Sequence, residues 1–172
     1  LAKTRPALLI GVGLHPNEAP HIFEKEGRAG LDAAYEAIRS MADEDVVRAV
    51  GETGLDYFRS SEELHAIQQE SFRRHIAIAK EVGKTLVIHD RESHQDVMDI
   101  LLEEGAPERV IFHCFSGDAA MAKLCTDQGW YISFAGVVTF KNATDLHEAA
   151  TVVPDELILV ETDAPYLTPV PN

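Results

Sequence analysis

The sequence predicts an α/β fold with parallel strands, and three observations support this class. Short runs that are nearly continuous in Val, Ile and Leu alternate with amphipathic segments along the whole chain. Such runs are typical of strands that are buried on both faces of a parallel sheet. A histidine or an acidic residue follows five of these runs, at the strand ends where α/β folds place their chemistry.

Six segments are candidate strands, in the order Ala7–Val12, Val46–Val50, Thr85–Ile88, Arg109–Phe112, Trp130–Phe134 and Glu156–Val160. Unbroken alternation of strand and helix implies parallel strands joined by right-handed crossovers. Six strands fit an open doubly wound sheet, and they also fit a (β/α)₈ barrel that lacks two strands. The pattern alone leaves both architectures open.

Helix signals lie between the candidate strands. Ser60 and Glu63 form a capping-box pattern before a helix that runs to about Val82, where Gly83 can end it. The same pattern, at Ser93 and Asp96, precedes a helix that Gly105 can end, and Asp118 can cap a third helix before Gly129. Weaker helix signals cover Leu31–Met41 and Asn142–Ala150.

Length and composition bound the possible classes. A chain of 172 residues fits one domain, so we expect a single domain over residues 1–172. We expect a cytoplasmic protein with no implied protein partner, because the sequence has only two cysteines, no secretory signal pattern and no membrane-spanning apolar run. The net charge of −14 and the lack of a Lys/Arg-rich run argue against a basic nucleic-acid-binding face. Phosphate binding would then depend on bound cations and a few arginines.

The residues that follow the strands form a consistent set of potential metal ligands: His15, Glu52, His89, His113 and Asp163. Imidazole suits Zn, Mn, Co and Fe, and a carboxylate adds charge and can bridge two ions. Such ions polarise a phosphoryl or carbonyl oxygen and lower the pKa of bound water. Five such groups at equivalent positions predict a metal site.

Other polar residues near the strand ends have simpler interpretations. Asp56 and Asp90 are typical of turn residues that bind backbone N–H groups. Arg91 is either a salt-bridge partner of Glu52 or Glu161, or a ligand for a substrate phosphate, and both readings stay open. We expect Cys114 to lie in the core. We expect the remaining histidines to lie at the surface: His21, His65, His75, His94 and His147.

Five motifs resemble the signature stretches of the TatD family of deoxyribonucleases. They are Gly-Leu-His-Pro at 13–16, Gly-Glu-Thr-Gly-Leu-Asp-Tyr at 51–57, Ile-His-Asp-Arg at 88–91, His-Cys-Phe-Ser-Gly at 113–117 and Glu-Thr-Asp-Ala-Pro-Tyr-Leu-Thr-Pro at 161–169. All five occur in family order and together span nearly the whole chain. The resemblance implies an incomplete TIM barrel of the amidohydrolase type that acts on DNA with one or two divalent ions (Zn, Mn, Mg, Co or Fe).

The resemblance also implies roles for single residues. Glu52 resembles the carboxylate that ligates or bridges the metals and takes part in catalysis. His89 and His113 resemble imidazole ligands, and Asp163 resembles the ligand that orients or deprotonates the attacking water. His15 is similar to a catalytic-site histidine of the family. Apart from the resemblance, Arg91 is the candidate residue for binding a substrate phosphate.

The resemblance further implies that two strands, including one with a His-x-His pair, and a final helix are absent at the ends of this chain. We therefore expect unpaired sheet edges and lower activity than a full-length protein would have. Two other functions stay open. The same ligands serve amidohydrolase-type enzymes on small esters or amides, which the acidic composition suits. Alternatively, the barrel is a non-catalytic binding or scaffold protein.

Overall fold

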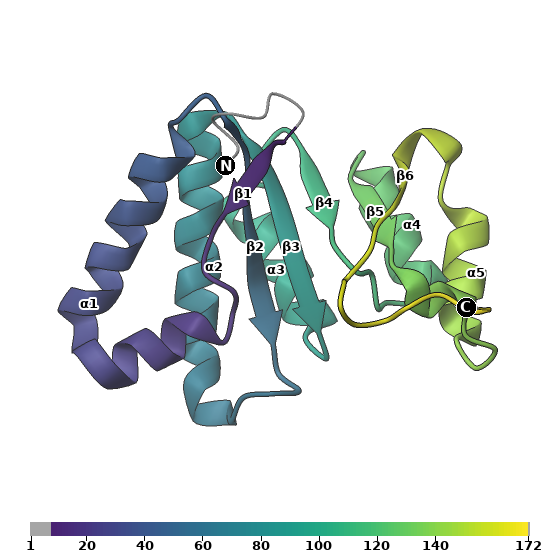
Figure 1. Ribbon diagram of the computed structural model, residues 1–172, viewed down its shortest axis with the longest axis horizontal. Coiled ribbons are helices and arrows are strands. Elements are labelled where there is room, and N and C mark those ends of the chain that lie inside the picture. Colours follow the sequence, from purple (N-terminus) through teal and green to yellow (C-terminus); the bar gives the residue numbers. More distant parts are fainter. Residues whose placement is uncertain (1–7, 172) are drawn as a thin grey trace. The chain divides into compact units, whose positions relative to one another are not determined.

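The computed structural model describes residues 8–171 and divides into two compact units, residues 1–110 and 111–172 (Figure 1). Each unit alternates strands with helices, so the predicted α/β class is confirmed. The first residue of the first predicted strand, Ala7, lies outside the described residues. The expectation of one domain over the whole chain stays a prediction.

The first unit contains three parallel strands in chain order: β1 (Ile10–Val12), β2 (Val47–Asp56) and β3 (Thr85–Arg91). Its helices are α1 (Glu18–Ala42), α2 (Glu62–Val82) and α3 (His94–Glu104). Helix α1 packs against α2, and α2 packs against β2 (Figure 1). Helix α1 is longer than predicted because two helical stretches join at a kink, at Gly27, where the backbone is not helical.

Strand β4 (Val110–Phe112) begins at the last residue of the first unit, and the second unit repeats the alternation with the rest of β4, β5 (Tyr131–Phe134) and β6 (Ile158–Val160). These strands are also parallel and follow chain order. Helices α4 (Ala119–Asp127) and α5 (Thr144–Val152) pack against each other, and short 3₁₀ helices cover Gly136–Thr139 and Asp155–Leu157. Six parallel strands are therefore described, as the sequence predicts. Among the helices within residues 8–171, none is long and apolar enough to cross a membrane.

The helix ends follow some of the predicted signals. Asp118 caps α4 by accepting a hydrogen bond from the Met121 N–H at 2.8 Å, and Gly83 ends α2 with a left-handed φ of 64°. The predicted capping boxes are wrong. The Ser60 hydroxyl instead donates to the Asp56 carbonyl at 2.7 Å, and the Ser93 hydroxyl oxygen lies 2.8 Å from Oδ1 of Asp90 and 3.0 Å from the Leu55 carbonyl oxygen. Both hydroxyls thus lie near the end of β2 and not on a helix N–H.

Strand β2 extends past its predicted end because two glycines let it approach β3 closely. An added Cβ at Gly54, where φ is +136°, would lie 2.0 Å from the His89 carbonyl oxygen, and one at Gly51 would lie 2.4 Å from that of Val87. The register between β2 and β3 shifts between Val50 and Thr53, a stretch that contains Gly51. Consequently Glu52 lies inside a strand, beside the neighbouring β3, instead of in a loop.

Two sequence expectations about single residues are wrong. His75 is completely buried, and its Nε2 accepts a hydrogen bond from the Leu14 N–H at 2.9 Å while its Nδ1–H donates to the Ser71 carbonyl at 2.7 Å. A helical position gave no sign of this, because one of the two partners of the ring, the Leu14 N–H, is distant in sequence. Cys114 is only partly buried, because β4 ends before it and its φ of 44° interrupts strand alternation.

Candidate metal centre

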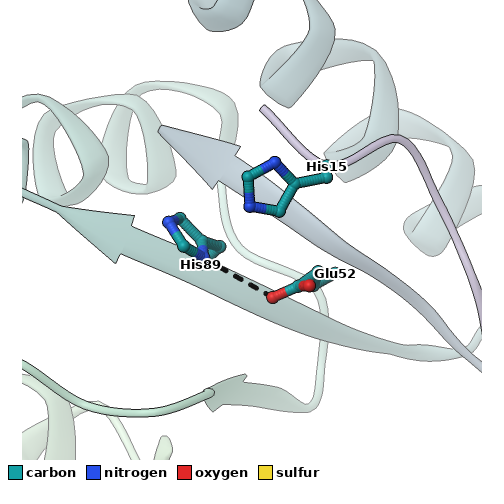
Figure 2. Close-up of side chains that lie close together, drawn as sticks. All are labelled: His15, Glu52 and His89. Carbon is teal, nitrogen blue, oxygen red and sulfur yellow. Dashed lines mark ion pairs between the residues drawn. The ribbon is translucent and has the colours of Figure 1, made fainter. Parts of the chain in front are cut away.

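Three side chains from the first unit converge on one point: His15 from the segment after β1, Glu52 from β2 and His89 from β3 (Figure 2). One ligand atom from each lies within 4.8 Å of the others. The Nδ1 atom of His89 is 3.5 Å from Oε2 of Glu52, and the rings of His15 and His89 are 4.5 Å apart between centroids. Two imidazoles and a carboxylate at these distances form a candidate divalent-metal site.

The surroundings of His89 fit a metal ligand. Its Nε2 is buried and has no hydrogen bond within the described residues, which is costly for a polar atom unless another partner binds it. The closest carboxylate oxygen recorded for this atom is Oδ2 of Asp56, at 3.5 Å. Asp56 is itself buried, and its Oδ1 accepts from the Arg59 N–H at 3.1 Å, which confirms its predicted turn role. Its position beside His89 was not predicted.

His15 is held in a defined orientation by the backbone. Its Nδ1 accepts a hydrogen bond from the Asn17 N–H at 3.2 Å. Burial lowers its pKa, and the nearby His89 lowers it further, against the opposing effect of Glu52. The ring is therefore neutral at pH 7, and with Nδ1 accepting, the ring proton lies on Nε2. In this tautomer Nε2 is a hydrogen-bond donor, so His15 would ligate a metal only after losing the Nε2 proton or the hydrogen bond from Asn17.

The second unit brings together His113, Glu161 and Asp163. The Nδ1 atom of His113 lies 2.8 Å from Oε2 of Glu161, and its Nε2 lies 3.8 Å from Oδ1 of Asp163. Glu161 also accepts a hydrogen bond from the Cys114 N–H. Metal-bound histidines typically have such a carboxylate on the other ring nitrogen, where it fixes the tautomer and the ring orientation.

Glu161 is a functional candidate that sequence reasoning missed. Its burial raises its pKa, but the hydrogen bond and charge of His113 and the Cys114 N–H outweigh that effect, so the pKa is lowered overall. The carboxylate is therefore ionised at neutral pH, as an orienting acceptor must be. The signal available in the sequence was its place at the residue directly after β6, two positions before Asp163.

Arg91 and Asp90 occupy the end of β3. The guanidinium of Arg91 lies over the ring of Phe58, 3.9 Å from the centroid, and it has no ion pair with a carboxylate within the described part of the first unit. Asp90 is buried, accepts from the Ser93 hydroxyl at 2.8 Å and pairs with Nδ1 of His94 at 2.7 Å. His94 is thus tied to a buried carboxylate, although it was expected to be a simple surface residue.

Parallel β/α units whose strand ends carry imidazole and carboxylate groups define an α/β chain of the TIM-barrel type with a candidate metal centre. The comparisons agree with this class. The chain belongs to the TatD family, because the family model described as TatD related DNase matches residues 1–172.

Curated relatives and solved structures resemble the chain closely. It is 46% identical over 166 residues to the uncharacterized metal-dependent hydrolase TatD of Mycobacterium tuberculosis, covering 94% of this chain and 60% of the relative. It is 46% identical over 173 residues to the uncharacterized metal-dependent hydrolase YcfH of Escherichia coli, covering 100% of this chain and 61% of the relative. The chain thus spans about three fifths of the length of these relatives.

The crystal structure of YJJV, a TatD homolog from Escherichia coli, matches with a TM-score of 0.84 and 27% identity, over 97% of this chain and 62% of that chain. A hydrolase TatD family protein from Entamoeba histolytica matches with a TM-score of 0.73 at 24% identity, over 93% of this chain and 52% of that one. These matches confirm the predicted fold, an incomplete TIM barrel with six strands.

Proposed function

We propose that the protein is a metal-dependent deoxyribonuclease that hydrolyses phosphodiester bonds with an activated water molecule. The proposal is carried by the cluster of His15, Glu52 and His89, in which the buried Nε2 of His89 has no hydrogen bond in the described residues. The family description as a DNase and the names of the relatives as metal-dependent hydrolases support the same reaction class.

The proposed metal ligands are Glu52 and His89 in the first unit and His113 and Asp163 in the second. The donor chemistry of imidazole and carboxylate fits one or two divalent ions, with Zn, Mn, Mg, Co and Fe all compatible. Such an ion supplies Lewis acidity to a phosphoryl oxygen and lowers the pKa of water. Bound cations would also offset the net charge of −14, which otherwise repels a polyanionic substrate.

The surrounding residues then have distinct tasks. The Asp163 side chain is 39% exposed, so its carboxylate can reach a water molecule and accept its proton. The Nε2–H of His15 can donate to an oxygen that gains negative charge as the phosphodiester is cleaved. Glu161 holds the ring of His113 and so acts as a positioning residue, while Asp56 places a carboxylate 3.5 Å from Nε2 of His89.

Chelation and substitution of Asp163 test this function. Treatment with EDTA and the change Asp163→Ala should each reduce hydrolysis of a single-stranded oligodeoxynucleotide by at least about 100-fold. EDTA removes the metal ion, and the substitution removes a proposed metal ligand and general base. Asp127→Ala is the matched control, because Asp127 is an exposed aspartate that pairs with Lys123 on α4. Nuclease activity that survives both treatments would refute the proposal.

A second candidate function keeps the same residues but changes the substrate. The net charge of −14 favours a small neutral or cationic ester or amide over a polyanion. Turnover of p-nitrophenyl esters or anilides that depends on Asp163, together with inert DNA, would favour this alternative over the deoxyribonuclease.

A further inference from the structure

An exposed aromatic ring and an arginine lie together at the ends of β2 and β3. The Phe58 side chain is 56% exposed, and the Arg91 guanidinium lies 3.9 Å from its ring centroid. Arg91 is aligned with Asp56 in the pairing of the two strands, and its carbonyl accepts from the Tyr57 N–H at 3.0 Å. The two strands therefore bring this pair together, although Phe58 and Arg91 are far apart in sequence.

The strand geometry also relates Arg91 to the metal cluster. Side chains two residues apart on a strand point to the same face, roughly 6 to 7 Å apart. In β3 the partly buried positions include His89 and Arg91, whereas Ile88 and Asp90 on the opposite face are buried. Arg91 thus follows His89 along the same face of β3. A ligand that contacts His89 can therefore extend to Arg91.

The segment that bears Phe58 is anchored by its neighbour Tyr57. The Tyr57 hydroxyl donates to Oδ2 of Asp96 at 2.6 Å and accepts from Gln69 at 2.7 Å, and its ring stacks on His65 with centroids 3.7 Å apart. Burial, followed by the hydrogen bond to Asp96, raises the pKa of Tyr57 to about 12, so the hydroxyl stays protonated and keeps donating. The exposed ring of Phe58 is therefore presented by a fixed backbone.

We infer that Phe58 and Arg91 form a subsite for one nucleotide of a single-stranded nucleic acid, next to the metal cluster. This subsite rests on the proposed deoxyribonuclease function, and it implies that the substrate of the enzyme is single-stranded. The exposed part of the Phe58 ring stacks an unpaired base, and aromatic stacking accepts any base because each has a π-face. The guanidinium has a planar set of N–H donors that match phosphate oxygens, and its place over the ring fixes their direction. A base must be unpaired to reach the ring, so single strands and frayed ends are preferred to intact duplex.

The test compares two single strands of equal length with phosphorothioate linkages, one natural and one with tetrahydrofuran abasic residues in place of every nucleotide. Binding is measured by fluorescence anisotropy in the presence of Mn²⁺, so that affinity is read separately from cleavage. Base stacking on one aromatic ring predicts that the protein prefers the natural strand by about 10-fold. In Phe58→Ala this ratio falls to about 1, since the base loses its contact surface.

Arg91→Lys distinguishes the two halves of the subsite. Lysine keeps the charge but loses the planar donor set, so affinity falls for both strands and the preference for the natural strand remains. Arg74→Lys and Leu102→Ala are matched controls. Arg74 lies 5.6 Å over another ring, Tyr35, and Leu102 is an exposed apolar residue of α3. Both controls should bind as the unaltered protein does.

The outcomes separate this subsite from the proposed reaction. Equal affinity of the unaltered protein for natural and abasic strands, or no affinity for either, would overturn the subsite. So would a Phe58→Ala variant that keeps the 10-fold preference expected from one stacked base. If binding behaves as predicted but unmodified DNA is not cleaved with any divalent ion, the subsite stands and the deoxyribonuclease proposal fails.

Discussion

The buried His75 makes the stability of the fold depend on pH in a way that one substitution can isolate. Its ring is completely buried on α2, and it must be neutral, because Nε2 accepts from the Leu14 N–H and Nδ1–H donates to the Ser71 carbonyl. Burial lowers its pKa to about 4 from an ordinary 6.5, partly offset by the Ser71 hydrogen bond. Protonation would break the bond to Leu14, which adjoins the candidate site residue His15.

The direction and size of the effect follow from this pKa. Between pH 6.5 and about 4 the unfolded chain binds a proton at residue 75 that the folded protein does not bind. The contribution of neutral His75 to the free energy of unfolding is therefore complete above pH 6.5 and decreases as the pH falls towards 4. At 1.36 kcal/mol for each pH unit, His75 should account for a loss of about 3 kcal/mol over this range.

The perturbation is His75→Gln, which keeps a polar side chain but does not titrate. The free energy of unfolding is measured by urea denaturation, followed by circular dichroism, at intervals from pH 7.5 to pH 4. Carboxylates contribute to the pH dependence of both proteins, so the difference between the two curves isolates His75. The unaltered protein should lose about 3 kcal/mol more than the variant on acidification. Parallel curves would refute the assignment of a neutral, buried histidine.

Two further substitutions test how the backbone and an orienting carboxylate shape the site. Gly54→Ala should lower the free energy of unfolding by about 2 kcal/mol or more, because its Cβ would lie 2.0 Å from the His89 carbonyl oxygen at a φ that side chains avoid. Gly83 has open space around it, so Gly83→Ala should lower the free energy of unfolding by only about 1 kcal/mol. Urea denaturation of both variants checks this, and equal losses would contradict it. Glu161→Gln should weaken zinc binding about 10- to 100-fold in a chelator competition, because it disturbs the orientation of His113; unaltered affinity would contradict that role.

Much of the fold was predictable because its signals are local. Apolar runs marked all six strands, and the helix boundaries at Gly83 and Asp118 follow from backbone preferences at those residues. The length of β2 was not predictable from such signals. A Gly-Glu-Thr-Gly stretch is typical of a turn, and only the close approach of β3 makes it a strand.

The candidate site was predictable to a similar extent. Strand-end positions identified His15, Glu52 and His89, which the structure brings together. Asp56 lies beside His89 and Glu161 orients His113, and both contacts join segments that are distant in sequence. The buried state of His75 goes with a hydrogen bond from the distant Leu14 N–H and cannot be read from its place on a helix.

The metal content of the purified protein tests the central claim most directly. After incubation with Zn²⁺ or Mn²⁺ and removal of the excess, elemental analysis should find a bound divalent ion in the unaltered protein. The metal content should fall in Glu52→Ala and in Asp163→Ala, because each removes a proposed ligand. Glu62→Ala, at an exposed position in the first turn of α2, should retain it. A protein that binds no ion, or variants that keep theirs, would contradict the account.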